Sequence, residues 1–162
     1  MHIEVTVHIS APPDRIWELV SDVTKIGRYS PETFEAEWLD GATGPSVGAK
    51  FRGHVKRNGK GPTYWTPCTV KTSVPGKEFS FGVLGKGDKP PLSVWGYHLV
   101  AAGDGTDVTE TFDLAPKLFL RIYWKLMGWS RGKTNTRGMT QTLNSIKAEV
   151  EVEGNPPTPR EP

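Results

Sequence analysis

Glu110 is the residue of this sequence whose position most directly suggests chemistry. It lies in the alternating segment 107–114 and shares the parity of Val108 and Phe112, so we expect its side chain to face inward. A buried carboxylate either pairs with another group or takes up a proton at a raised pKa. Glu110 is therefore a candidate acid or base, or an acceptor for a ligand hydroxyl. A pair with an inward Arg or Tyr, and a bulge that turns the side chain outward, stay open as alternatives.

Tyr97 is the second candidate for proton transfer, because the parity of segment 92–101 also turns it inward. The other reactive groups form no recognisable site. The four histidines show no metal-ligand spacing, and Cys68, the one cysteine, has no CxxC companion. The sequence contains no phosphate-binding glycine loop and no GxSxG nucleophile elbow. We therefore predict neither a metal nor a cofactor.

Seven segments that alternate between apolar and polar residues carry these candidates, and turn-forming residues separate them. The segments are 2–10, 33–39, 49–56, 64–74, 77–84, 92–101 and 107–114. Between the first two, residues 13–23 have helical spacing and residues 24–28 suggest a second short helix. Short loops between successive strands favour antiparallel pairing over parallel crossovers.

The segment 134–152 predicts a long C-terminal helix. Its apolar stripe follows steps of four, three and four residues and consists of Met139, Leu143, Ile146 and Val150. Such a helix must bury its stripe against another layer, and most of the chain before it reads as strand. We predict an α+β fold in which a curved antiparallel sheet wraps around this helix. Residues 1–152 then form one domain, and 153–162, with four prolines, form a disordered tail.

Several short segments, in this order, resemble the START-like, helix-grip superfamily (SRPBCC), and within it the small bacterial polyketide cyclase/dehydrase proteins. The matching segments are residues 3–32, WLDG at 38–41, VGAKFRG at 47–53, YWTPCTV at 64–70, PGKEFSF at 75–81, TDVTETFDL at 106–114 and NTRGMTQTLNSIKAE at 135–149. The resemblance covers about residues 2–150 and implies the helix-grip fold. It implies less about activity, because the superfamily includes ligand carriers, lipid-transfer domains, cyclases and chaperone-like proteins.

A sheet curved around a helix leaves an apolar space between them unless side chains fill it, and ligand sites are typically of this kind. Parity and helical spacing assign ten residues to this space, with the register of Trp65 left open. The predicted ligand-binding residues are Phe51, Trp65, Phe81, Trp95, Tyr97, Phe112, Phe119, Trp124, Met139 and Leu143. The alternative for each of them is plain core packing.

Residues 116–129 suggest an amphipathic helix with an excess of apolar surface. Lys117, Arg121 and Lys125 form one narrow basic stripe, and apolar residues cover the remainder. We expect the excess to form a lid over the cavity first, and a homodimer interface or a membrane contact otherwise. Gly128 and Gly132 are the candidate hinge.

The composition narrows the class of partners. A net charge of +2 and the absence of long Lys/Arg runs argue against nucleic acid. The basic parity of segment 49–56 (Lys50, Arg52, His54 and Lys56) is expected to be a solvated face without interleaved aromatic residues. A single cysteine fits a reducing compartment, and we find no signal peptide and no run long enough to span a membrane. These features predict a cytoplasmic protein, monomeric or homodimeric.

Three functions are consistent with these features. The first is binding or transport of a hydrophobic small molecule, lipid-like or polyketide-like. The second is a polyketide cyclase or dehydratase in which Glu110 and Tyr97 transfer protons. The third is an interaction module with a vestigial pocket. A dedicated cyclase should present several convergent titratable groups, and parity supports only these two, which favours binding.

Overall fold

The computed structural model describes residues 1–59, 61–83, 90–115 and 118–154; within these ranges the side chains of residues 58, 118–133, 153 and 154 are not described. Seven strands form one antiparallel sheet in the order β1-β7-β6-β5-β4-β3-β2. Their bounds are β1 His2–Ile9, β2 Thr33–Trp38, β3 Lys50–Val55, β4 Tyr64–Val74, β5 Glu78–Val83, β6 Ser93–Ala102 and β7 Gly105–Leu114. The helices are α1 Pro13–Ser21, η1 Val23–Arg28, η2 Arg57–Gly59 and α2 Leu118–Gly154.

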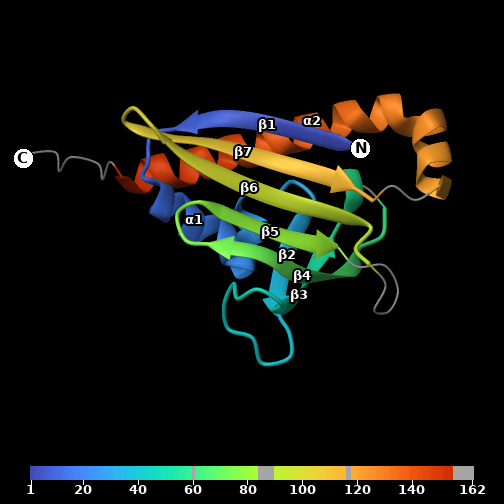
Figure 1. Ribbon diagram of the computed structural model, residues 1–162, viewed down its shortest axis with the longest axis horizontal. Helices are drawn as coiled ribbons and strands as arrows, with labels where there is room; N and C mark the ends of the chain where they lie inside the picture. The colour runs from blue at the N-terminus through green and yellow to red at the C-terminus, as the bar shows by residue number, and fades with distance from the viewer. Residues whose placement is uncertain (60, 84–89, 116–117, 155–162) are drawn as a thin grey trace, which may run out of the picture.

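The sheet curves, and α1 and α2 lie on the same side of it (Figure 1). This arrangement confirms the predicted α+β helix-grip fold. The predicted segments agree with the observed strands to within two residues at the ends, and the short helix predicted at 24–28 corresponds to η1. Successive strands from β2 to β7 pair with their neighbours, and β1 closes the other end by pairing with β7.

The C-terminal half of α2 packs as its apolar stripe predicts. Met139, Leu143, Ile146 and Val150 are all buried, whereas Asn144 on the opposite face is exposed. Three of them (Leu143, Ile146 and Val150) belong to the main core, together with residues of α1, η1 and the concave face of the sheet. Burial of this stripe fixes α2 against the sheet.

The backbone of α2 is continuous from Leu118, so the segment 116–129 and the segment 134–152 are parts of one helix rather than two. Figure 1 shows its first turns at an angle to the remainder. Gly128 and Gly132 lie inside this helix. The side chains of 118–133 lie outside the described residues, so the lid, the dimer interface and the membrane contact stay predictions.

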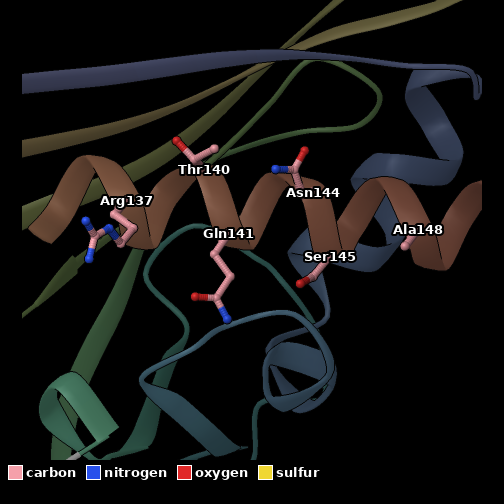
Figure 2. A pocket seen from close by; sticks show the side chains of 6 residues that line it. All are labelled: Arg137, Thr140, Gln141, Asn144, Ser145 and Ala148. Atoms are coloured by element: carbon pink, nitrogen blue, oxygen red, sulfur yellow. The ribbon is translucent and has the colours of Figure 1, made fainter.

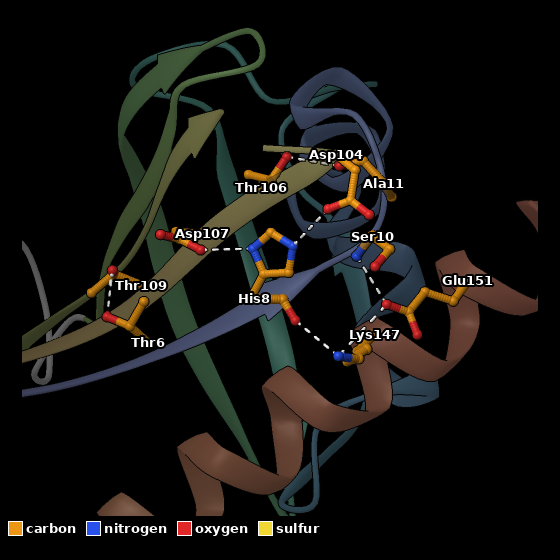
Figure 3. A network of polar contacts seen from close by, with 10 residues as sticks. All are labelled: Thr6, His8, Ser10, Ala11, Asp104, Thr106, Asp107, Thr109, Lys147 and Glu151. Atoms are coloured by element: carbon orange, nitrogen blue, oxygen red, sulfur yellow. Dashed lines mark hydrogen bonds and ion pairs between the residues drawn. The ribbon is translucent and has the colours of Figure 1, made fainter. Parts of the chain in front are cut away.

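Both edges of the sheet are covered. At the β1 edge, Lys147 Nζ of α2 donates a hydrogen bond to the carbonyl oxygen of His8 at 3.0 Å, and the backbone N–H of Ser10 donates to Glu151 at 2.9 Å (Figure 3). At the β2 edge, η1 approaches so closely that a Cβ on Gly27 would lie 2.2 Å from the carbonyl oxygen of Phe34. Covered edges protect a sheet from pairing with other chains.

Candidate functional site

Glu110 of β7 lies on the face of the sheet that carries the core and is only 4% exposed. The pairing of β7 with β6 and with β1 is regular around it, so no bulge turns its side chain outward. Tyr97 is its register partner on β6, and the Tyr97 hydroxyl donates a hydrogen bond to Oε1 of Glu110 at 3.3 Å. The structure therefore selects the alternative in which an inward tyrosine pairs with the carboxyl group.

The second carboxyl oxygen of Glu110, Oε2, has different surroundings. Oε2 is buried and accepts or donates no hydrogen bond among the residues that the structure describes. Burial raises the pKa of Glu110 to about 8, and the hydrogen bond from Tyr97 opposes this only in part. Near neutral pH the side chain is therefore mainly a neutral carboxylic acid that can donate a proton or a hydrogen bond.

Tyr29, at the C-terminal end of η1, completes this polar group and was missed by the sequence analysis. It is 3% exposed, and its pKa is raised first by burial and then by the negative charge of Glu110. Burial and the same charge raise the pKa of Tyr97 well above its ordinary value. Both tyrosines therefore stay protonated. Strand parity cannot assign a residue in a turn, although Tyr29 begins the Tyr-Ser-Pro-Glu turn at 29–32.

Aromatic side chains continue the concave face beyond Glu110. The rings of Trp95 and Phe112, register partners on β6 and β7, lie 4.6 Å apart. Phe81 pairs with Trp95 from the other side, and its ring lies 5.2 Å from that of Phe51. Phe51 and Phe112 are buried, while Phe81 and Trp95 are only partly buried. Parity thus placed these four aromatic residues on the correct face.

From the helix side, Met139 and Leu143 are buried opposite this face, as predicted. The remaining predicted ligand-binding residues, Phe119 and Trp124, lie outside the described side chains, so the internal cavity remains a prediction. Two hollows lined by described residues lie elsewhere. One, of about 560 Å³, runs along the exposed face of α2 (Figure 2), and the other, of about 680 Å³, lies between Trp17 of α1 and the loop 41–47.

The prediction that Trp65 lines the cavity is wrong. Trp65 is three residues from Cys68, the inward register partner of Phe51, so it lies on the opposite, outer face of the sheet. There its ring stacks on that of His54 at 4.4 Å, with an interplanar angle of 14°, and the Arg52 guanidinium lies 4.4 Å from its centre. The buried Cys68 and Val70 show that even-numbered residues of β4 up to Val70 face inward. Because residues 64 and 65 are both aromatic, the sequence alone does not reveal which of the two faces inward.

The outer face of β3 also differs from the sequence-based expectation. That expectation was a basic, solvated surface without aromatic residues. The ring of Phe34 on β2 also contacts the His54 ring, with 4.4 Å between ring centres, and Phe34 is about half exposed. The basic residues are paired as well: Arg52 with Glu37, and His54 with Glu35 at 3.3 Å. The face is therefore close to electrically balanced, and the aromatic rings stack on its basic side chains.

A family model described as polyketide cyclase / dehydrase and lipid transport matches residues 1–151. The chain belongs to this family. The comparison with curated proteins gives no match.

Solved structures support the same fold for this polyketide cyclase/dehydrase family protein. The polyketide-cyclase-like protein Cgl2372 from Corynebacterium glutamicum is 27% identical, with a TM-score of 0.63 over 99% of this chain and 97% of that one. Protein CV1439 from Chromobacterium violaceum is 17% identical, with a TM-score of 0.67 over 93% and 96% of the two chains. DynU16, a protein in the dynemicin biosynthetic locus, is 18% identical, with a TM-score of 0.62 over 94% of this chain and 48% of DynU16.

The other reactive side chains that the structure describes in this family member do not form a second candidate site. Within the described residues, no three His, Cys, Asp or Glu side chains gather as a metal site. The Cys68 thiol is buried, and burial raises its pKa to about 12, which makes it a poor nucleophile. No helix in the described part of the chain is both long enough and apolar enough to cross a membrane. The group formed by Glu110, Tyr97 and Tyr29 remains the candidate site.

Proposed function

We propose that this protein binds a hydrophobic small molecule, lipid-like or polyketide-like, between the concave face of the sheet and α2. The observation that carries the proposal is the buried pair of Glu110 and Tyr97 beside a row of aromatic side chains. Ligand sites combine an apolar lining with a few convergent polar groups, and this face has both. The family description, which includes lipid transport, agrees with such a ligand.

The burial of neighbouring residues supports an opening at the aromatic end. Val108 of β7 is fully buried in the main core, and Glu110 and Phe112 follow it along the strand. Phe112 packs against the partly exposed Trp95, which lies outside the main core. The strand then leads to residues 116–133, the segment whose sequence predicts a lid containing Phe119 and Trp124. In the proposal, the ligand lies between these aromatic residues, with Glu110 and Tyr97 at its inner end.

Two tryptophans allow a matched test of this site. Native mass spectrometry of the freshly purified protein should detect a retained apolar molecule. A fluorescent hydrophobic probe should bind saturably, and the retained molecule, once extracted from the protein, should displace the probe. Trp95→Ala should weaken binding of the probe about tenfold or more, as the loss of a buried aromatic contact does. Trp65→Ala, on the outer face, should leave binding unchanged. Equal effects of both variants would contradict the proposed location.

The second candidate is a cyclase or dehydratase, and the raised pKa of Glu110 beside Tyr97 favours it specifically. A neutral Glu110 donates its proton to a departing hydroxyl, which leaves as water. The carboxylate so formed then removes the proton α to the substrate carbonyl, which restores the acid. Glu110→Gln keeps the shape and abolishes this cycle, so turnover of a β-hydroxyketone should fall about a hundredfold or more. A binding protein should instead keep most of its affinity in this variant.

A further inference from the structure

The two oxygens of the Glu110 carboxyl group have different surroundings. Oε1 accepts the hydrogen bond from the Tyr97 hydroxyl at 3.3 Å. Oε2 is buried and has no hydrogen-bond partner among the described residues. Buried polar atoms in folded proteins are hydrogen-bonded in the great majority of cases. A buried oxygen without a partner in the described part of the chain, next to an apolar surface, points to a partner that the ligand supplies.

The direction of the Tyr97 hydrogen bond determines what Oε2 can do. Tyr97 keeps its proton because its pKa is raised, so its hydroxyl is the donor and Oε1 the acceptor. A neutral carboxyl group has one oxygen that carries the proton and one that does not. With Oε1 acting as acceptor, the proton belongs on Oε2. Oε2 is then a hydrogen-bond donor without an acceptor among the described residues.

The neighbours of Glu110 restrict the acceptor further. Its register partner on β1 is Val5, and the residues on the same face of β7 are Val108 and Phe112, all of them apolar. Among the described residues, the titratable groups that act on the Glu110 site are Tyr97 and Tyr29, both phenols that stay protonated. A carbonyl oxygen satisfies Oε2 and introduces no new donor. An alcohol brings an O–H as well, which must give up its hydrogen bond to water. Val5, Val108 and Phe112 offer it no acceptor, and the Tyr97 and Glu110 oxygens that could accept it are already engaged with each other, so an alcohol gains less than a carbonyl group does.

We propose that Oε2 of Glu110 donates a hydrogen bond to a carbonyl oxygen of the bound molecule, so that the site selects hydrophobic ketones and esters over hydrocarbons and alcohols of the same shape. The molecule enters with its carbonyl group toward Glu110 and its apolar body against Trp95 and Phe81. This inference rests on the proposed binding function. It adds to that function the chemical group which the ligand must present and the orientation in which it binds.

Three naphthalene probes with the substituent at the same ring position test this selection on the full chain: acetylnaphthalene, naphthylethanol and ethylnaphthalene. Their affinities are measured by titration calorimetry. The ketone should bind about five- to tenfold more tightly than the hydrocarbon, the ratio expected for one net hydrogen bond, and also more tightly than the alcohol. Glu110→Gln should keep this preference, because its amide oxygen accepts from Tyr97 and its NH₂ group donates in place of Oε2. Glu110→Leu should abolish it.

Infrared difference spectroscopy gives a second readout that depends only on the contact itself. The carbonyl stretch of bound acetylnaphthalene should shift to lower frequency in the native protein and in Glu110→Gln, and should not shift in Glu110→Leu. Circular dichroism establishes that each variant is folded, and if Glu110→Leu is not, the native protein and Glu110→Gln still decide the question. Equal affinities of ketone and hydrocarbon in the native protein, or a preference for the alcohol, overturn this inference and leave the proposed function standing. Absence of saturable binding by all three probes overturns both.

Discussion

Lys147 of α2 reaches the carbonyl oxygen of His8 on β1, with 3.0 Å between Nζ and oxygen. The same ammonium group lies 3.7 Å from Glu151, which accepts the backbone N–H of Ser10 (Figure 3). Two charged side chains of the helix thus bind backbone groups at the end of the edge strand. This relationship ties the last turns of α2 to the sheet independently of the apolar stripe.

Replacing Lys147 tests the strength of that connection. Lys147→Met keeps the length and apolar stem of the side chain and removes the donor to His8. We expect the free energy of unfolding to fall by about 1 kcal/mol or less, because the group is partly exposed. Urea denaturation measures the change. Lys25→Met is the control, since Lys25 forms its ion pair with Asp22, three residues before it, and it should have a smaller effect.

Leu143→Ala should destabilise the fold strongly. Leu143 is fully buried in the main core, and truncation of a buried leucine typically costs about 2–5 kcal/mol. Asn144→Ala changes the next residue of the same helix, which is exposed, and should stay within about 0.5 kcal/mol of the native protein. Chemical denaturation of both variants checks the difference. Similar stabilities of the two variants would contradict the observed packing of α2.

Glu110 should make the protein less stable as the pH rises through neutrality. The pKa of Glu110 is about 8 in the folded chain, whereas in the unfolded chain it has the ordinary value of 4.5. Between these two pH values the folded chain therefore binds a proton that the unfolded chain releases. The stabilising contribution is fully present below about pH 4.5 and is lost as the pH approaches about 8, by an amount on the order of a few kcal/mol.

The difference between the native protein and Glu110→Gln isolates this effect. His2 and His8 also have raised pKa values, through carboxylates on β7, and they contribute a slope of the same sign to both proteins. The free energy of unfolding, measured by urea titration from acid to slightly alkaline pH, should therefore decline less steeply in Glu110→Gln. Parallel curves for the two proteins would show that Glu110 has the same pKa in the folded and unfolded chain, which would contradict its raised pKa.

Gly27→Ala should damage the contact between η1 and β2. The added methyl carbon would lie 2.2 Å from the backbone carbonyl oxygen of Phe34, and backbone cannot move aside as a side chain can. We expect a loss of more than about 2 kcal/mol, in the range of overpacking and backbone strain. Gly44→Ala, where the methyl group meets no atom within 4 Å, is the matched control and should be nearly neutral. Melting temperatures of the two variants measure the contrast.

Trp124→Ser tests the predicted lid. If the segment 116–129 closes the cavity, this variant should release a bound hydrophobic probe several-fold faster in stopped-flow measurements. An unchanged release rate together with a change from dimer to monomer in solution would identify the segment as a subunit interface. Loss of liposome binding alone would identify a membrane contact. Native behaviour in all three assays would contradict each of these roles.

The periodicity of the sequence predicted most of the fold and the central part of the candidate site. Glu110 and Tyr97 were placed together because strand parity is reliable where a strand alternates regularly and pairs without a bulge. Trp65 was misplaced because Tyr64 precedes it, and two adjacent aromatic residues fit either face equally well. Tyr29 was missed because its position depends on how η1 packs against the sheet, which no local pattern encodes. Register and long-range packing, rather than element type, limited the sequence analysis.

The buried Cys68 has a practical consequence for spectroscopy. Its thiol is buried, and burial raises its pKa so that it stays protonated at ordinary pH. Alkylating dyes should therefore not react with Cys68 while the chain is folded. A second cysteine placed at an exposed position such as Val100 would then take up a fluorophore selectively, without removal of the native thiol. Conversely, the rate at which Cys68 itself reacts reports how often the sheet opens. The protected Cys68 therefore allows selective labelling of an introduced cysteine, and its own slow reaction is a probe of core opening.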